Sequence, residues 1–187
     1  MKKIALVVLV VIMASLLLCS CGEKTQTGYR YAEITFKDYG TVKLTLNATQ
    51  APITVANFVK LAEAGKYDGN QIIRVQQNFV IQSYMEEKVD AIKGEFWYNG
   101  VNNEISHERG VISMARSDSY NSATSDFFIM LANNTGLDGL YAAFGWVTEG
   151  MEIIDKIAAD AKGKEIHSMG FLDPSAYVTI ESVKITG

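Results

Sequence analysis

The sequence predicts a mainly β fold, a closed antiparallel barrel of about eight strands with two helices over its open ends. Three observations lead to this prediction. Short segments with period-two alternation of apolar and polar residues recur along the chain, and only two segments show helical spacing. No internal repeat or long linker divides the sequence. Closure removes exposed strand edges, which favours a barrel, although periodicity alone leaves a β-sandwich open.

The first two strands form a tightly turned hairpin. Apolar and polar residues alternate from residue 29 to residue 37 and again over residues 41–46, and residues 38–40 supply the turn. Each strand therefore buries one face and exposes the other. The inward positions are Ala32, Ile34, Phe36, Val42, Leu44 and Leu46.

The helices follow from spacing and from their end signals. Pro52 suits the first turn of a helix, apolar residues then recur at helical intervals, and Gly65 is placed to stop it. A second helix is predicted over residues 151–161. The remaining strands are predicted at residues 71–75, 78–82, 110–114, 126–131, 142–147 and 177–185.

The N-terminal segment is predicted to be a targeting signal. Two lysines precede an apolar run over residues 4–18, which is shorter than the roughly 20 residues that a membrane-spanning helix needs. The run ends in LCSC, which resembles a bacterial lipobox, so residues 1–20 would be removed and Cys21 lipidated. The alternatives are Cys19, where Leu18 fits the motif less well, and an ordinary signal peptide with two incidental cysteines. Residues 21–28 are interpreted as a flexible tether before a domain over residues 29–187.

Composition excludes several classes of function. Without Lys2 and Lys3 the chain carries 15 basic and 21 acidic side chains, a net charge of −6, and no basic cluster, so nucleic-acid binding is not expected. No cysteine follows Cys21, which excludes an internal disulfide in the domain. The only histidines are His107 and His167, and His167, in a polar loop, is expected to be exposed. Neither a metal site nor a cofactor is predicted.

One arginine lies inside an apolar run. Arg74 occurs in IIRVQQNFVIQ, residues 72–82, and a Phe-Phe pair follows in SATSDFF, residues 122–128. A buried arginine is costly unless it has partners and a task. The alternative interpretation is that Arg74 only pairs with a carboxylate at a strand end.

Five segments together resemble the cyclophilin-type peptidyl-prolyl isomerases, in the order and near the spacing of that family. The resemblance implies an eight-stranded closed β-barrel capped by two α-helices. It also implies catalysis of cis–trans exchange without cofactor or metal. The matching segments are TVANFVKLAEAGKYDG (54–69), IIRVQQNFVIQ (72–82), HERGVISMAR (107–116), NSATSDFFI (121–129) and LDGLYAAFGWVTEGMEIIDKI (137–157).

The resemblance assigns roles to residues. Arg74 matches the catalytic arginine, and Gln82 matches the glutamine that positions it. His107 lies in a family segment without a catalytic role and is interpreted as structural. Four apolar residues would hold the proline ring, although each one alone fits an ordinary core, and two others would bind the substrate chain through their backbone. The residues implied to bind substrate are Phe79, Val80, Phe128 and Leu137 in the pocket, Ala115 and Arg116 along the chain, and Asp126 and Tyr141.

The sequence also departs from the family, whose string around the arginine is close to FHRVIPGFMIQGGD. Ser83 and Tyr84 replace two glycines. Asp126 replaces a glutamine, and it would either pair with Arg74 or accept a substrate N–H. Gly136 replaces a larger side chain, which implies weak binding of the family's cyclic peptide inhibitor.

The prediction is a monomeric, lipid-anchored prolyl isomerase outside the cytoplasm that assists the folding of proline-containing exported polypeptides at the membrane surface. Two alternatives belong to other classes. One is a non-catalytic peptide-binding module or holdase, suggested by Asp126, Ser83 and Tyr84. The other is an interaction scaffold that uses the barrel surface.

Overall fold

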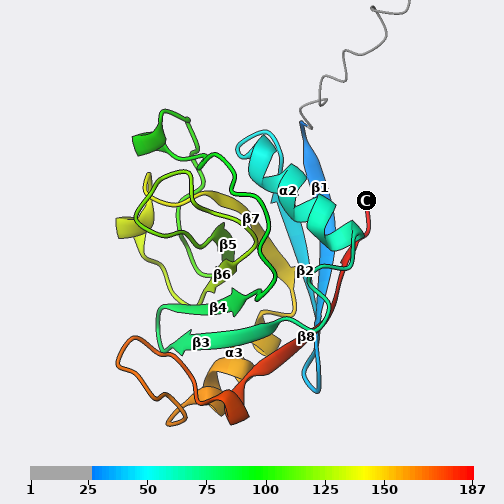
Figure 1. The fold of residues 1–187 in the computed structure, drawn as a ribbon, viewed down its shortest axis with the longest axis vertical. Coiled ribbons are helices and arrows are strands. Elements are labelled where there is room, and N and C mark those ends of the chain that lie inside the picture. The colour runs from blue at the N-terminus through cyan, green and yellow to red at the C-terminus, as the bar shows by residue number, and fades with distance from the viewer. Residues whose placement is uncertain (1–26) are drawn as a thin grey trace, which may run out of the picture.

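The computed structural model describes residues 27–187. The predicted signal peptide over residues 1–20, the predicted lipidation at Cys21 and the tether as far as residue 26 lie outside the described residues. Within residues 27–187 the chain forms a barrel with two α-helices packed against it (Figure 1).

Eight antiparallel strands close the barrel in the order β1-β2-β7-β5-β6-β4-β3-β8. Closure confirms the predicted fold class and excludes the sandwich, because every strand has a partner on both sides. The strands are β1 (Tyr29–Phe36), β2 (Gly40–Asn47), β3 (Gln71–Gln76), β4 (Val80–Tyr84), β5 (Val111–Met114), β6 (Phe127–Met130), β7 (Ala143–Glu149) and β8 (Val178–Ile185).

The two predicted helices are present as α2 (Pro52–Glu63) and α3 (Met151–Ala161). Pro52 occupies the first turn of α2, and Gly65 follows the helix with φ of +66°, a left-handed conformation that glycine adopts without steric cost. Figure 1 shows α2 beside β1 and β2, and α3 at the lower edge of the barrel. Within residues 27–187 neither helix is long and apolar enough to cross a bilayer. Short 3₁₀ turns are η1 (Trp97–Asn99), η2 (Thr135–Leu137) and η3 (Pro174–Ala176).

A distant carboxylate caps α2. Ala51 at the N-cap offers no side-chain acceptor, but the buried Glu95 accepts hydrogen bonds from the backbone N–H groups of Ile53 and Thr54 over 3.0 and 2.7 Å. A negative charge at this end of a helix satisfies unpaired donors and favours the helix dipole. Glu95 therefore fixes the long loop after β4 against the helix.

The strand predicted over residues 78–82 is displaced by two residues, because β4 begins at Val80. Asn78 adopts φ of +58°, which places it in the β3–β4 turn rather than in the ladder. The turn closes when the Phe79 N–H donates to the Gln76 carbonyl over 3.0 Å. Phe79 is therefore a turn residue, half-buried at the rim of the sheet.

Buried apolar residues form two separate clusters. The larger fills the barrel, and alternate residues of β4 and β6 enter it, among them Ile81, Phe127 and Ile129. The residues between them point the other way, because successive side chains of a strand face opposite sides. This outer cluster consists of Val80, Val111, Phe128, Met130 and Ala143, with Phe79, Ile105, Ala115, Leu137, Tyr141 and Trp146 packed on it.

Candidate functional site

A hollow of about 260 Å³ opens beside the outer cluster. Its wall contains every catalytic or substrate-binding residue predicted from the sequence except Asp126, together with one that was not predicted, Phe171. Val80 and Phe128 belong to the outer cluster, and Phe79 and Leu137 pack on it, so all four pocket residues lie outside the cluster that fills the barrel. The lining residues are Arg74, Phe79, Val80, Gln82, Ala115, Arg116, Phe128, Leu137, Tyr141 and Phe171.

Strand register brings the polar groups of the hollow together. Arg74 pairs directly with Gln82 across β3 and β4, and Gln76 lies two residues along β3 on the same face. Arg74 Nη1 donates to Gln82 Oε1 over 2.9 Å, and Nη2 donates to Gln76 Oε1 over 2.5 Å. Arg74 Nε donates to the Met169 carbonyl over 2.7 Å. Three acceptors on three segments therefore fix the plane of the guanidinium.

Two aromatic rings lie beside the same guanidinium. Its carbon is 5.7 Å from the centre of the Phe79 ring and 5.8 Å from that of Phe171, within the range of cation–π attraction. Partial burial lowers the pKa of Arg74, and the nearby Tyr141 partly opposes that shift. An arginine remains protonated at neutral pH despite such a shift. The hollow therefore holds a fixed positive charge beside apolar surface.

The alternative that Arg74 pairs with a carboxylate is wrong for the part of the chain that the structure describes. Its three hydrogen bonds go to two neutral amides and one backbone carbonyl, and none of the ion pairs among residues 27–187 includes it. A cation with neutral acceptors keeps its charge available to a bound molecule. Two of its five donors remain beyond the three that are engaged.

The apolar floor of the hollow is supported from behind. Phe128 stacks on His107 with ring centres 6.0 Å apart and meets the edge of Tyr141 at 5.7 Å. His107 is buried, and its two ring nitrogens lie 2.9 Å from Asp138 Oδ1 and 3.0 Å from Ser113 Oγ. His107 is therefore a structural residue, as the sequence predicted.

Electrostatics leave His107 neutral and Asp138 ionised at neutral pH. Burial lowers the pKa of His107, and the hydrogen bond with Asp138 only partly opposes it. Burial raises the pKa of Asp138, but hydrogen bonds from the His107 backbone, Ser106 and the His107 ring outweigh it and leave that pKa low. A neutral imidazole thus donates to an ionised carboxylate, which fixes the ring under Phe128.

Asp126 lies outside the hollow. Its Oδ1 accepts the Met85 N–H over 2.8 Å, and burial raises the pKa of its carboxyl group. The expectation that Asp126 pairs with Arg74 is therefore wrong, because this oxygen serves the chain after β4. Ser83 has a similar structural role: its hydroxyl donates to the Phe127 carbonyl and accepts the Phe127 N–H. Tyr84 is exposed.

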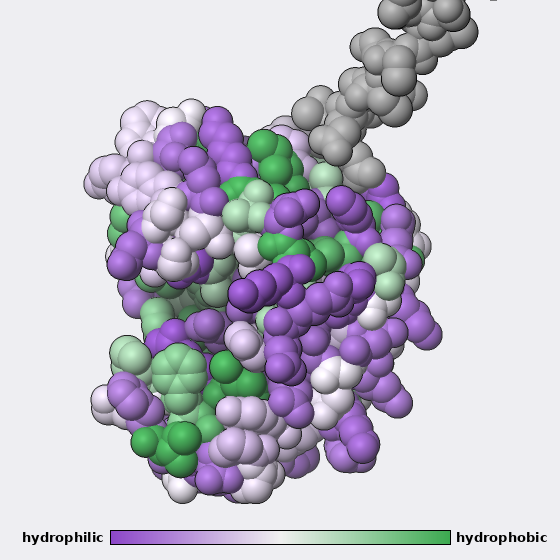
Figure 2. Space-filling view, in the orientation of Figure 1, coloured by the Kyte–Doolittle hydropathy of each residue, from purple (hydrophilic) through white to green (hydrophobic). Residues whose placement is uncertain are grey.

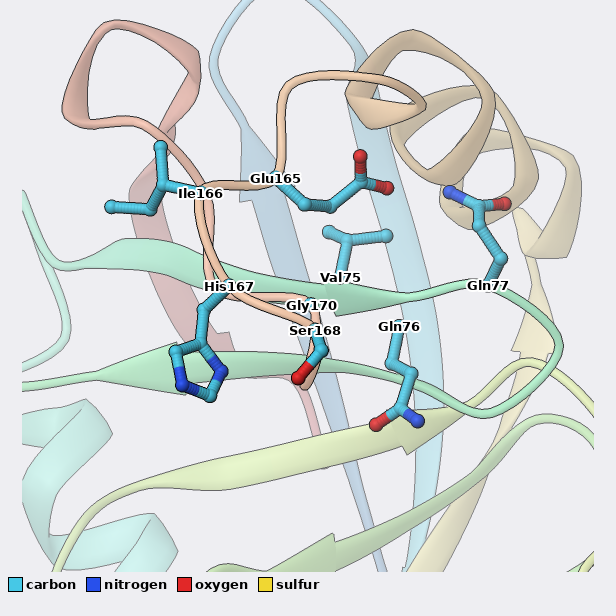
Figure 3. A pocket seen from close by; sticks show the side chains of 8 residues that line it. All are labelled: Val75, Gln76, Gln77, Glu165, Ile166, His167, Ser168 and Gly170. Carbon is cyan, nitrogen blue, oxygen red and sulfur yellow. The ribbon is translucent and has the colours of Figure 1, made fainter.

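Sequence reasoning missed the segment over residues 164–172, which supplies the Met169 carbonyl and the Phe171 ring and bridges to β3 at Arg74. Figure 3 shows part of this segment, with Glu165 to Ser168, beside Val75 and Gln76 of β3. Gly170 is the point of closest approach, because a Cβ there would lie 2.6 Å from the Val75 carbonyl oxygen. A wider hollow of about 540 Å³ lies beside this segment, bordered by Gln76, Gln77 and residues 165–168. The one available signal was Gln76, which stands where the family string has isoleucine.

Neither histidine is placed to bind a metal. His167 is exposed, and its Nδ1 accepts the Met169 N–H over 3.2 Å. Among residues 27–187, no group of three or more His, Cys, Asp or Glu side chains could hold a metal ion. The hollow itself offers the Arg74 guanidinium with apolar surface around it.

Known proteins share both the sequence and the fold. Residues 31–185 match the family model described as cyclophilin type peptidyl-prolyl cis-trans isomerase/CLD. Peptidyl-prolyl cis-trans isomerase A of Dickeya dadantii is 36% identical over 160 residues, which cover 78% of this chain and 80% of that protein. A peptidyl-prolyl cis-trans isomerase of Streptomyces antibioticus is 35% identical over 162 residues, covering 79% of this chain and 94% of that one.

Solved structures agree on the architecture. A cyclophilin type peptidyl-prolyl cis-trans isomerase of Cryptosporidium parvum, crystallised in the presence of the dipeptide Ala-Pro, superimposes with a TM-score of 0.70 at 23% identity. The match covers 84% of this chain and 99% of that one. A second structure of the same protein gives a TM-score of 0.71. At this identity the likeness concerns the fold.

Proposed function

The chain belongs to the cyclophilin-type peptidyl-prolyl cis–trans isomerases, and from this premise we propose that it isomerises X-Pro bonds in exported polypeptides at a membrane surface, with Arg74 as its catalytic residue. The observation that carries this proposal is the guanidinium fixed at the edge of an apolar hollow. The hollow has the shape and polarity to take a proline ring and leaves the charge beside it.

The reaction needs no nucleophile. Amide resonance holds an X-Pro bond planar with a barrier of about 18–20 kcal/mol, and uncatalysed exchange takes tens of seconds or longer. A catalyst has to bind the twisted amide better than either planar form. Twisting breaks the resonance and leaves the lone pair on the proline nitrogen, where it can accept a hydrogen bond.

Arg74 is suited to stabilise that twisted state. Its two unengaged N–H groups belong to Nη1 and Nη2, because Gln82 and Gln76 each take one hydrogen from these nitrogens. A donor that is already oriented loses little entropy in the transition state and gains strength as the lone pair forms. Gln82 is the positioning residue, as the family resemblance implied, and Gln76 and the Met169 carbonyl act with it.

The apolar residues hold the ring while the chain turns. Val80 and Phe128 are buried at the floor, and Phe79, Leu137 and Tyr141 are half-buried around it. In this proposal Ala115 and Arg116 lie along the path of the substrate chain. The Cryptosporidium protein, which has the same fold, was crystallised in the presence of the dipeptide Ala-Pro, and we propose a proline-containing substrate for this chain as well.

The cellular setting is proposed from the N-terminal sequence. A basic start, an apolar run and the LCSC motif support export and lipidation at Cys21. Two or more acyl chains anchor a protein stably, whereas a single chain does not. Mass spectrometry of the mature N-terminus tests this part: a diacylated or triacylated Cys21 supports it, and an unmodified N-terminus at another residue contradicts it.

The catalytic proposal is tested by NMR exchange spectroscopy on a short X-Pro peptide. We expect the full mature domain to accelerate exchange, and Arg74→Ala to lower the catalysed rate by about 100-fold or more, as for loss of a preorganised donor. Arg109→Ala is the matched control, because Arg109 pairs with Asp155 outside the hollow. Equal rates for Arg74→Ala and wild type would remove Arg74 from catalysis, and peptide binding without acceleration would favour the holdase alternative.

A further inference from the structure

A second guanidinium borders the same hollow. Arg116 lies among three aromatic rings, with its guanidinium carbon 5.4 Å from the centre of Phe96, 5.1 Å from Tyr120 and 4.7 Å from Tyr141. The sequence resemblance gave this position a backbone role only. In the structure Arg116 lines the hollow, and its guanidinium lies over the ring of Tyr141, which also lines it.

The Arg116 side chain is held in one orientation. Nε donates to the Leu140 carbonyl over 2.9 Å, and Nη1 donates to the carbonyls of Ser117 and Asp118 over 2.8 and 3.3 Å. Nη2 makes no hydrogen bond to any residue that the structure describes. A guanidinium fixed on one side by carbonyls and rings, with its far nitrogen unengaged, presents two preorganised donors.

The hollow is cationic although the protein is acidic. Its lining contains Arg74 and Arg116 and no carboxylate, and within the described residues neither arginine forms an ion pair. Two aspartates close to the lining residues in sequence are engaged elsewhere. Asp126 accepts from Met85, and Asp138 accepts from Ser106 and His107.

Tyr141 links the two charges. Its ring stacks against Arg116, its edge meets Phe128 at 5.7 Å, and it also opposes the fall in the pKa of Arg74. A proline seated on Phe128 would therefore share the hollow with two guanidinium groups, those of Arg74 and Arg116. Only the Arg74 guanidinium is needed at the proline nitrogen of the twisted amide. The Arg116 guanidinium is therefore available to the substrate residues that flank the proline.

We propose that Arg116 selects proline segments that carry an acidic residue beside the proline, by hydrogen bonding its carboxylate through Nη2. This inference rests on the proposed isomerase function and adds the substrate class. Charge-assisted hydrogen bonds from arginine to carboxylate are among the stronger ones in proteins. The contact is the same in the planar and the twisted peptide, so it lowers KM and leaves kcat unchanged.

The test compares peptides that differ only in charge, with Glu or Gln immediately before the proline and a second pair with Glu or Gln immediately after it. For wild type we expect kcat/KM to be about fivefold higher for the Glu peptide than for the Gln peptide in at least one of the two pairs. The expected ratio is modest because the site is open to solvent. The difference should lie in KM and should shrink in high salt.

Two variants identify the residue responsible. In Arg116→Gln the Glu-to-Gln ratio should fall to about one, and Arg116→Lys should retain part of it, because lysine keeps the charge without the planar donor pair. Arg30→Gln removes the same charge from β1, outside the hollow, and should keep the wild-type ratio. A ratio in Arg116→Gln equal to that of wild type would overturn the proposal.

The two proposals fail in different ways. If wild type accelerates exchange equally for Glu and Gln peptides, the isomerase function stands and the acidic preference is wrong. If no peptide exchanges faster, the isomerase function is wrong, and NMR titration of the same peptides still measures the Glu-to-Gln affinity ratio. A preference that appears only as a lower kcat for Glu peptides would show the carboxylate on Arg74 and would also overturn the proposal.

Discussion

The inner and outer faces of β4 and β6 carry adjacent residues with different tasks. Phe127 is fully buried in the barrel core, where it meets Phe58 and Tyr67, whereas Phe128 is buried in the outer cluster and floors the hollow. One strand thus contributes to two apolar clusters through side chains that point in opposite directions. Figure 2 shows apolar and polar residues interspersed over one side of the molecule.

The comparison teaches that burial alone does not identify a functional residue. The side chains of Phe127 and Phe128 are both almost inaccessible to solvent. Of the two, only Phe128 lines the hollow that also contains Arg74 and Arg116. We expect side chains on the inner face to determine the free energy of unfolding, and side chains on the outer face to determine activity toward X-Pro peptides. The predictions below test that division, beginning with the largest change in free energy.

Phe127→Ala should be the most destabilising change. It removes a ring from the closed core, where a cavity cannot easily collapse, and we expect a loss of about 3–5 kcal/mol in the free energy of unfolding. Urea unfolding followed by circular dichroism measures it. A loss below about 1 kcal/mol would mean that the inner face is not the stabilising one.

Glu95→Ala should destabilise the fold without touching the hollow. It removes both acceptors of the Ile53 and Thr54 N–H groups at the start of α2, and we expect a loss of about 2–3 kcal/mol. Glu95→Gln keeps one acceptor oxygen and should lose about half as much. Urea unfolding measures both, and an unchanged free energy in Glu95→Ala would contradict the capping role.

Phe128→Ala should raise KM for an X-Pro peptide more than Phe127→Ala does, although it should destabilise the fold less. Removing the floor of the hollow should raise KM for an X-Pro peptide by about tenfold, the value expected for losing part of an apolar pocket. The loss of stability should be smaller than for Phe127→Ala, because the site is already open on one side. Exchange rates over a range of peptide concentrations separate KM from kcat, and an unchanged KM would exclude Phe128 from binding.

Lowering the pH should reduce the contribution of His107, which packs behind Phe128, to the free energy of unfolding. We expect this to be the smallest of the effects. Burial holds the folded-state pKa of His107 below its ordinary value of 6.5, so the unfolded chain binds the proton first. This contribution to stability is present above 6.5 and is lost as the pH falls from there toward the lower folded value. Urea unfolding at pH 7.5 and 5.5 should show the decrease.

His107→Gln should flatten that dependence on pH, and His167→Gln, which changes an exposed histidine, should not. The variant comparison is needed because Asp126 acts in the opposite sense. Its pKa is raised in the folded state, so its contribution is present at low pH and is lost as the pH rises through that pKa. A slope that persists unchanged in His107→Gln would contradict the role given to His107.

Local patterns predicted much of the fold. Alternation in β1 and β2 and helical spacing in α3 gave those elements, because their apolar residues face one core. The β4 prediction was displaced because Asn78 adopts a left-handed conformation, which the apolar run that follows it over residues 79–81 conceals. The cap at α2 could not be predicted, because Glu95 is more than forty residues away in sequence from the backbone N–H groups that donate to it.

The resemblance to a known family predicted the main residues of the site, whereas the contacts that hold them could be found only in the structure. The positions of Arg74 and Gln82 followed from the shared motif, and register then explains why they touch. The Met169 carbonyl and Phe171 come from a segment in which no pattern marks a partner for Arg74. The same is true of the ring cage around Arg116, which is assembled from three separate loops.

One NMR titration tests the central claim, that the Arg74 guanidinium stabilises the twisted amide and not the planar one. The dissociation constant of an X-Pro peptide and the exchange rate of the bound peptide are measured on the same samples of wild type and Arg74→Ala. The account predicts affinities within about threefold and a bound exchange rate at least about 100-fold lower in the variant. Affinity and bound exchange rate that fall together, or a bound rate equal to wild type, would contradict it.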